Sequence, residues 1–179
     1  MKKEYWKRLS TGTLLKHPRI TIVEDEVILP TGTQTKYLRF EGLNDYVTVI
    51  AVRENKIAMI REYSYPHDEW LYQFPEGVID TGETPDDGAR RELAEETGLT
   101  TERIKKIGIN YDHHRRNTTI DHVFIATGIK EGAKPVGDEE EHGTETYWFT
   151  IDEVKNMLRN GKIVQKNAQA AVALYFLAL

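Results

Sequence analysis

The feature that most constrains this chain is a short acidic helix, which the sequence predicts over residues 85–97. Thr84 can cap the start of such a helix through its side-chain oxygen. Pro85 suits the first helical position, where the missing N–H would have no partner within the helix. Gly98 is the residue type that most often follows the end of a helix. The sequence therefore predicts a helix that begins after Thr84 and ends at Gly98.

Three glutamates, Glu92, Glu95 and Glu96, share one side of this helix. At about 100° per residue they fall within an arc of roughly 100°, and each like-charge pair costs about 0.2–0.5 kcal/mol. A divalent cation such as Mg²⁺, which prefers oxygen ligands, would remove that cost. A solvated acidic face is the commoner explanation of such a charge run. However, Arg91 and Glu83 lie nearby, so a basic group is available to hold one carboxylate while others bind a metal.

The spacing of these residues resembles the complete signature of the Nudix hydrolases. Gly77 is followed after five residues by Glu83, and after seven more by the run from Arg91 to Leu99, with no position missing. The resemblance implies hydrolysis of a nucleoside diphosphate linked to another moiety, with Mg²⁺ or Mn²⁺ as cofactor. It implies that Glu92, Glu95 and Glu96 bind the metal, with the backbone carbonyl of Glu76 as a further candidate. Arg91 and Glu83 are expected to hold these ligands in register.

Composition sets limits on other functions. The 179 residues, 39% of them hydrophobic, suffice for one compact domain, with or without a small N-terminal addition. A net charge of −5, from 24 basic and 29 acidic residues, argues against a protein that binds nucleic acid by neutralising phosphates. Cysteine is absent, and we find neither a secretory signal nor an apolar run long enough to span a membrane. We expect a cytoplasmic protein without nucleic-acid or membrane partners.

The order of predicted elements indicates an α/β fold of the α+β type, with a mixed sheet between helices and a small N-terminal antiparallel sheet. Residues 1–43 form the N-terminal region, in which 20–29 and 36–40 read as a hairpin. Residues 44–179 form the catalytic domain. Strands are expected at 46–53, 56–62, 70–74, 104–110, 120–127 and 147–150, and helices at 151–158 and 167–177. The last helix is apolar nearly all round, which predicts that it is buried.

The N-terminal layout resembles that of the Nudix subgroup that hydrolyses ADP-ribose and related sugar nucleotides. In that subgroup the region pairs two subunits and contributes to the substrate pocket. The resemblance therefore implies a homodimer whose N-terminal region takes part in substrate binding.

Two loops are candidates for the rest of the site. The loop at 112–117 carries His114, Arg115 and Arg116, which could bind phosphate or a second metal because arginine offers bidentate contacts to phosphoryl oxygens. A solvated basic loop is an equally good explanation. The loop at 137–145 is strongly acidic, and water attacking phosphorus needs a carboxylate to take its proton. By resemblance to the sugar-nucleotide enzymes we select Glu141, with Glu140 and Glu145 next, against the alternative of a charged surface loop.

Two departures from the ADP-ribose subgroup leave the substrate open. The subgroup usually has a proline where this chain has residues 112–116, and an arginine after the second core strand, where this chain has residues 62–65. Arg61 could substitute for that arginine. The resemblance implies cleavage of a nucleoside diphosphate sugar, such as ADP-ribose or GDP-mannose, into a nucleoside monophosphate and a sugar phosphate. The alternatives are a nucleoside triphosphate pyrophosphohydrolase and a nucleotide-sensing module without catalysis, although a sensor has no need of all four signature glutamates.

Overall fold

The computed structural model describes residues 5–132 and 143–178. The chain divides into two compact units. One comprises Met1–Asn44 together with Tyr111–Thr119, and the other comprises Asp45–Asn110 together with Ile120–Leu179. A segment from the second half of the sequence therefore belongs to the same unit as the N-terminal strands.

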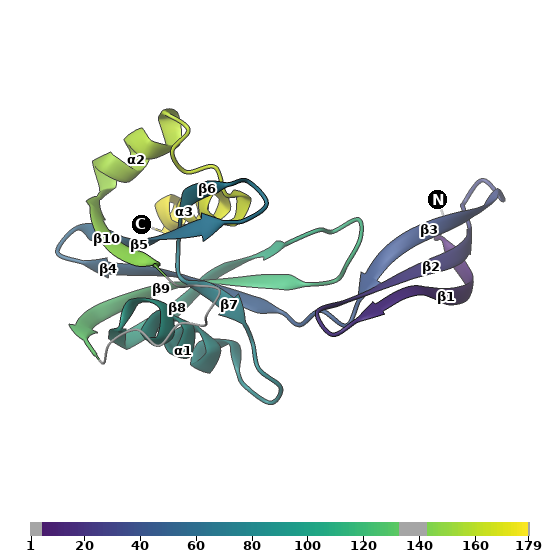
Figure 1. Ribbon diagram of the computed structural model, residues 1–179, viewed down its shortest axis with the longest axis horizontal. Helices are drawn as coiled ribbons and strands as arrows, with labels where there is room; N and C mark the ends of the chain where they lie inside the picture. Colours follow the sequence, from purple (N-terminus) through teal and green to yellow (C-terminus); the bar gives the residue numbers. More distant parts are fainter. Residues whose placement is uncertain (1–4, 133–142, 179) are drawn as a thin grey trace. The chain divides into compact units, whose positions relative to one another are not determined.

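The N-terminal unit contains a three-stranded antiparallel sheet (Figure 1). Its strands are β1 (Lys7–His17), β2 (Ile20–Ile28) and β3 (Gln34–Glu41), in the order β1-β2-β3. The predicted hairpin is present as β2 and β3, and Val23 and Val27 on β2 are buried on one face as strand alternation requires. Every residue of the edge strand β1 is exposed.

The larger unit is built on a mixed sheet whose main path is β10-β5-β4-β9-β8. Within this sheet β4 and β9 run parallel, whereas β5 is antiparallel to both β4 and β10. The short strands β6 and β7 pair with β5 and β4, respectively. The strands are β4 (Tyr46–Arg53), β5 (Lys56–Ser64), β6 (Glu69–Gln73), β7 (Glu76–Val78), β8 (Leu99–Tyr111), β9 (Ile120–Glu131) and β10 (Glu145–Thr150).

Three helices cover the two faces of this sheet: α1 (Pro85–Thr97), α2 (Ile151–Arg159) and α3 (Lys166–Ala178). Helix α1 lies on one face, and α2 and α3 lie on the other (Figure 1). Each face has its own core, one centred on Leu93 of α1 and Phe124 of β9, the other on Phe74 and Val172 of α3. The predicted fold class, a mixed sheet between helices with a small antiparallel sheet, is confirmed.

Helix α1 has the ends that the sequence predicts. The Thr84 hydroxyl accepts a hydrogen bond from the Asp87 backbone N–H, and Pro85 occupies the first turn. Gly98 follows the helix in the left-handed conformation, with φ of 68°, and its N–H donates to the Ala94 carbonyl. The helix that carries the signature glutamates is therefore fixed at both ends by its own sequence.

The prediction that the last helix is buried is correct for only one side of the helix. Helix α3 buries Ala168, Ala171, Val172 and Tyr175, whereas Leu177 is 85% exposed. The helix covers one face of the sheet, so only the side that meets the sheet is enclosed. Within the described part of the chain, no helix combines the length and apolar character needed to cross a membrane.

Candidate active site

The side chain of Arg91 organises the carboxylates around helix α1. Its Nε donates to Glu83 Oε1 and its Nη2 to Glu83 Oε2, both at 2.9 Å. Its Nη1 donates to Glu92 Oε1 at 2.7 Å and to Glu95 Oε2 at 2.9 Å, and its Nη2 also donates to the Val78 carbonyl at 2.8 Å. A guanidinium has five N–H donors, so these five bonds use all of them.

Glu83 is the bidentate partner of Arg91 and comes from the loop before the helix. Its side chain is 15% exposed, and its Oε2 also accepts from the Asp80 backbone N–H at 3.0 Å. The hydrogen bonds from Arg91 lower the pKa of the Glu83 carboxyl, and Glu83 in turn raises the pKa of Arg91. Both groups are therefore held in their charged forms, as the predicted positioning role requires.

Gly77, on strand β7, lies directly against the carboxyl group of Glu92. A Cβ added at Gly77 would come within 2.1 Å of the Glu92 carboxyl carbon, so no other residue type fits while Glu92 keeps this position. The backbone conformation of Gly77 does not require glycine. The close approach of β7 to α1 therefore explains why this position of the signature is a glycine.

The three glutamates of α1 differ in exposure. Glu92 and Glu96 are each 8% exposed, whereas the side chain of Glu95 is 45% exposed. The backbone N–H of Glu76 donates to Glu96 Oε2 at 3.2 Å, which joins β7 to the end of the helix. Burial raises the pKa of the Glu76 side-chain carboxyl to about 7. The structure thus brings Glu76 beside the glutamates with which it was predicted to act.

The donor set fits a hard divalent cation in its chemistry. Glu92, Glu95 and Glu96 supply carboxylate oxygens on one helix face, and two of the three are shielded from water. Among the described residues, no group of three His, Cys, Asp or Glu side chains is already placed to hold a metal ion. In this arrangement Arg91 holds one oxygen of Glu92 and one of Glu95.

A cavity of about 370 Å³ in the same unit has Glu76 in its wall. Its walls come from the β5–β6 hairpin, from Glu76 and from Gln165 just before α3. Gln165 Nε2 donates to Glu76 Oε1 at 2.8 Å, and Gln73 Nε2 donates to Glu62 Oε2. The sequence did not predict that Glu62, Gln73 and Gln165 line one cavity. Such polar residues are common, and no local sequence pattern indicates that these three lie close together.

Arg61 lies on β5 in the same unit as this cavity. Its guanidinium is 5.6 Å from the Trp70 ring centroid and 5.9 Å from that of Tyr72. On the neighbouring strand β10, Glu145 is its partner in register, and the Tyr147 hydroxyl donates to the Glu145 carboxylate. The pairing of β5 with β10 therefore brings Arg61, predicted to bind substrate, next to Glu145, a candidate for the catalytic base. Glu140 and Glu141, the other candidates for the base, lie outside the described residues.

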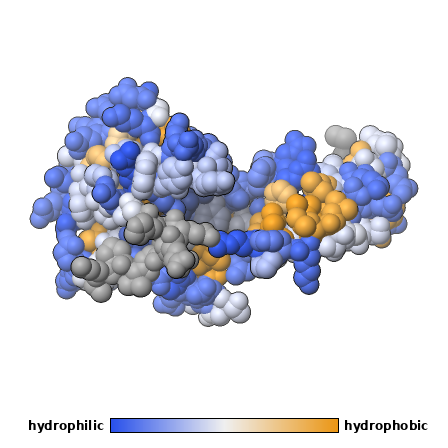
Figure 2. All heavy atoms as spheres, viewed as in Figure 1, coloured by the Kyte–Doolittle hydropathy of each residue, from blue (hydrophilic) through white to orange (hydrophobic). Residues whose placement is uncertain are grey.

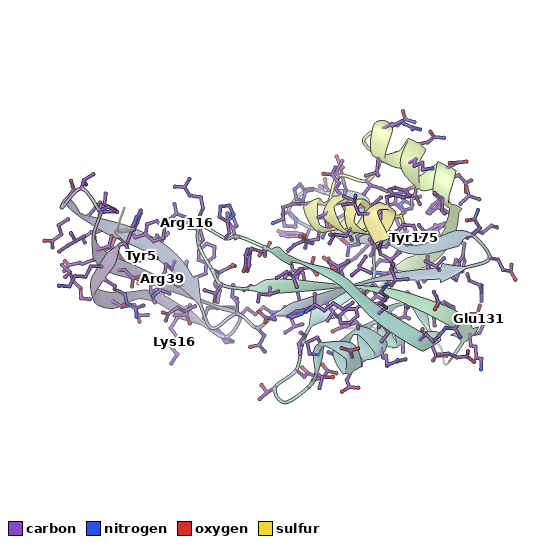
Figure 3. The ribbon with its side chains drawn as sticks, turned by 180° about the vertical axis from the view of Figure 1, so that it is seen from behind. Tyr5, Lys16, Arg39, Arg116, Glu131 and Tyr175 are labelled. Carbon is purple, nitrogen blue, oxygen red and sulfur yellow. The ribbon has the colours of Figure 1, made fainter. Side chains whose placement is uncertain are left out.

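His114, Arg115 and Arg116 belong to the N-terminal unit, in which the loop after β8 packs beside β3. Arg116 Nη1 donates to the Leu38 carbonyl at 3.0 Å, and its guanidinium lies 4.9 Å from the Tyr37 ring centroid (Figure 3). The three residues line a second cavity of about 370 Å³ formed within that unit. The predicted phosphate-binding residues are thus divided between the two units.

Comparison with known proteins agrees with the geometry. The NUDIX domain model matches residues 42–169. The chain is 27% identical to a methanol dehydrogenase activator of Bacillus methanolicus, over 97% of this chain and 92% of that protein. It is also 27% identical to an ADP-ribose pyrophosphatase of Bacillus subtilis, over 100% of this chain and 96% of the relative.

A solved structure described as an ADP compounds hydrolase has the same fold. It superposes with a TM-score of 0.91, covering 100% of this chain and 96% of that one, at 17% sequence identity. The matching family model includes the whole of helix α1 with its arginine and glutamates, and it spans most of the chain. The chain therefore belongs to the Nudix domain family of hydrolases.

Proposed function

We propose that this protein hydrolyses the pyrophosphate bond of a nucleoside diphosphate sugar, ADP-ribose or a related compound, in a reaction that depends on Mg²⁺ or Mn²⁺. The products would be a nucleoside monophosphate and a sugar phosphate. The match to an ADP-ribose pyrophosphatase along the whole chain supports this substrate class.

The observation that carries the proposal is the use of every Arg91 donor. A helix with three crowded carboxylates needs a positive group to hold it together, and Arg91 meets that need with five hydrogen bonds. A sensor without catalysis would not need this arrangement. The intact set of glutamates around a fully bonded arginine therefore favours a catalytic protein.

Each group has a proposed role. A divalent cation held by Glu92, Glu95, Glu96 and the Glu76 carbonyl would lower the pKa of the attacking water and offset the charge that develops on phosphoryl oxygens. Arg91 and Glu83 keep these ligands in position. A glutamate of residues 139–145 takes the proton from the water, and Glu145 is the candidate that the structure describes. Arg61, His114, Arg115 and Arg116 are proposed to contact the phosphates of the substrate.

We also propose that the region up to residue 43 joins two subunits into a homodimer and adds contacts to the substrate. Its edge strand β1 is fully exposed, and apolar side chains gather over this sheet (Figure 2). An exposed edge strand and an exposed apolar surface are both features that a partner subunit would cover. Among residues 5–43, the exposed large apolar side chains are those of Tyr5, Trp6, Leu9, Leu14, Leu15 and Leu38.

Hydrolysis of ADP-ribose in ¹⁸O-labelled water with Mg²⁺ tests the reaction. We expect AMP and ribose 5-phosphate as products, with the label in one of their phosphates, because the water attacks phosphorus. Mass spectrometry of the separated products locates the label. Label found only in a sugar hydroxyl would mean that a glycosidic bond is cleaved, and the proposed reaction would be wrong.

Replacing Arg91 by Lys tests the positioning role. Lysine has three donors and no planar fork, so it cannot hold Glu83, Glu92 and Glu95 together. We expect kcat/KM to fall by about 10- to 100-fold, with a higher Mg²⁺ concentration needed for half-maximal rate. Arg90→Lys is the matched control, because Arg90 makes a single described bond, to the Thr101 carbonyl, that a lysine can also make. Equal activity of the two variants would contradict the role.

Replacing Gly77 by Ala tests the packing of β7 against α1. The new methyl group would displace the Glu92 carboxylate, so we expect a loss of Mg²⁺-dependent turnover of at least about tenfold, in line with other changes that disturb metal ligands. A thermal unfolding measurement shows whether the loss of turnover occurs without a general loss of stability. Val78→Ala serves as the control, because Val78 lies next to Gly77 on β7 and its side chain is exposed. Full activity of Gly77→Ala at limiting Mg²⁺ would show that the position of Glu92 does not matter.

Replacing Leu14 by Glu tests the homodimer. Leu14 lies on β1 and is 59% exposed in the single chain. A charge at a buried subunit interface is strongly unfavourable, so we expect sedimentation analysis to show a dimer for the wild type and a monomer for this variant. Thr31→Glu in the β2–β3 turn is the control. A monomeric wild type, or a Leu14→Glu variant that remains dimeric, would refute this interface.

A further inference from the structure

The cavity that Glu76 shares with the active site is acidic, and none of its described lining residues is a lysine or an arginine. Glu62 and Glu76 line it. The remaining polar lining groups are mainly hydroxyls and amides. Among the described lining residues, His67 is the one that carries a basic side chain, and its Nδ1 is 2.8 Å from the hydroxyl oxygen of Ser64 within the same hairpin. The walls are therefore poorly suited to an anionic group.

Both carboxylates are held in fixed positions by glutamine side chains. Gln73 on β6 donates to Glu62 on β5, and Gln165 donates to Glu76. Gln165 is itself anchored, since its Oε1 accepts from the Ala168 backbone N–H at 2.5 Å. The acceptor groups of this cavity are thus set by the fold before any ligand arrives.

The Glu76 carboxyl group forms part of the cavity wall and is held by amide side chains. Gln165 Nε2 donates to its Oε1, and the side chain of Asn167 in α3 also interacts with this carboxyl group. With the hydroxyls and amides of the hairpin, the wall therefore offers groups to which a hydroxyl-rich ligand can hydrogen bond.

Glu76 links the wall of the cavity to the carboxylate helix. Glu76 contributes its side chain to the cavity and its backbone N–H to Glu96 of α1. Because one residue takes part in both, we place the diphosphate of the substrate at the helix and its next group in the cavity.

We propose that this cavity binds the distal, hydroxyl-rich group of the substrate and that the carboxylate of Glu62 selects against a phosphate in its place. This inference rests on the proposed function and specifies its selectivity. Sugar hydroxyls donate to carboxylates and amides, whereas a terminal phosphate brings only acceptors and negative charge. Like charges brought together disfavour the wrong ligand. The site thus favours a nucleoside diphosphate sugar over a nucleoside triphosphate.

The test compares ADP-ribose with ATP, which share adenosine and two phosphates and differ in the distal group. We expect wild-type kcat/KM to favour ADP-ribose by on the order of tenfold or more. Glu62→Gln removes a charge and keeps the shape of the side chain, so it should reduce this preference by about tenfold, mainly through a lower KM for ATP. Ser64→Lys, which adds a positive charge at the same cavity, should act in the same direction.

Glu69→Gln is the matched control, because Glu69 lies on β6 of the same hairpin but outside the cavity lining. This variant should keep the wild-type preference for ADP-ribose over ATP. A wild-type protein without preference would overturn the inference, as would a Glu69→Gln variant that changes as much as Glu62→Gln. Glu62→Gln and Ser64→Lys variants that both keep the wild-type preference would also overturn it.

Calorimetry measures the binding of ADP-ribose and of ATP without divalent ions. Because this measurement does not depend on hydrolysis, it tests the cavity assignment separately from the proposed function. If neither nucleotide is hydrolysed, the proposed function fails. Tighter binding of ADP-ribose than of ATP, with the difference reduced in Glu62→Gln, would then still support the cavity assignment. Equal or tighter binding of ATP by the wild-type protein would overturn it.

Discussion

The bidentate pair between Arg91 and Glu83 is the interaction on which the rest of the site depends. Helix α1 carries several negative side chains, and Arg91 on the same helix forms ion pairs with two of them, Glu92 and Glu95. Glu83 fixes two of the guanidinium nitrogens, which leaves Nη1 directed at Glu92 and Glu95. The fixed plane of the guanidinium thus holds the carboxylates of a crowded helix face, which are the proposed metal ligands, in defined positions.

Close packing of strand β7 against α1 gives the second constraint. The missing side chain at Gly77 allows the Glu92 carboxyl group to lie against the strand backbone, and the Glu76 N–H then reaches Glu96. The same strand places the Glu76 side chain in the wall of the adjoining cavity. One short strand therefore links the proposed metal ligands to the proposed selection of the distal group.

Residues that were predicted to bind substrate together belong to different units of the chain. Arg61 and Glu145 face each other on neighbouring strands of the larger sheet, because β5 and β10 pair in that register. His114, Arg115 and Arg116 lie with the N-terminal strands, where the Phe40 N–H donates to the Arg116 carbonyl. A basic loop can be recognised from its composition, but the unit to which it belongs depends on long-range backbone pairing.

The sequence by itself determined the helix ends, the order of the main elements and the spacing of the signature glutamates, because capping and periodicity act over a few residues. It also predicted Arg91 as the partner of those glutamates. Only the tertiary structure decided that Gly77 is required by contact with Glu92, that α3 buries a single side, and that Gln165 reaches Glu76 across 89 positions of the chain. Those features depend on which faces of distant elements meet, and local side-chain patterns do not encode that information.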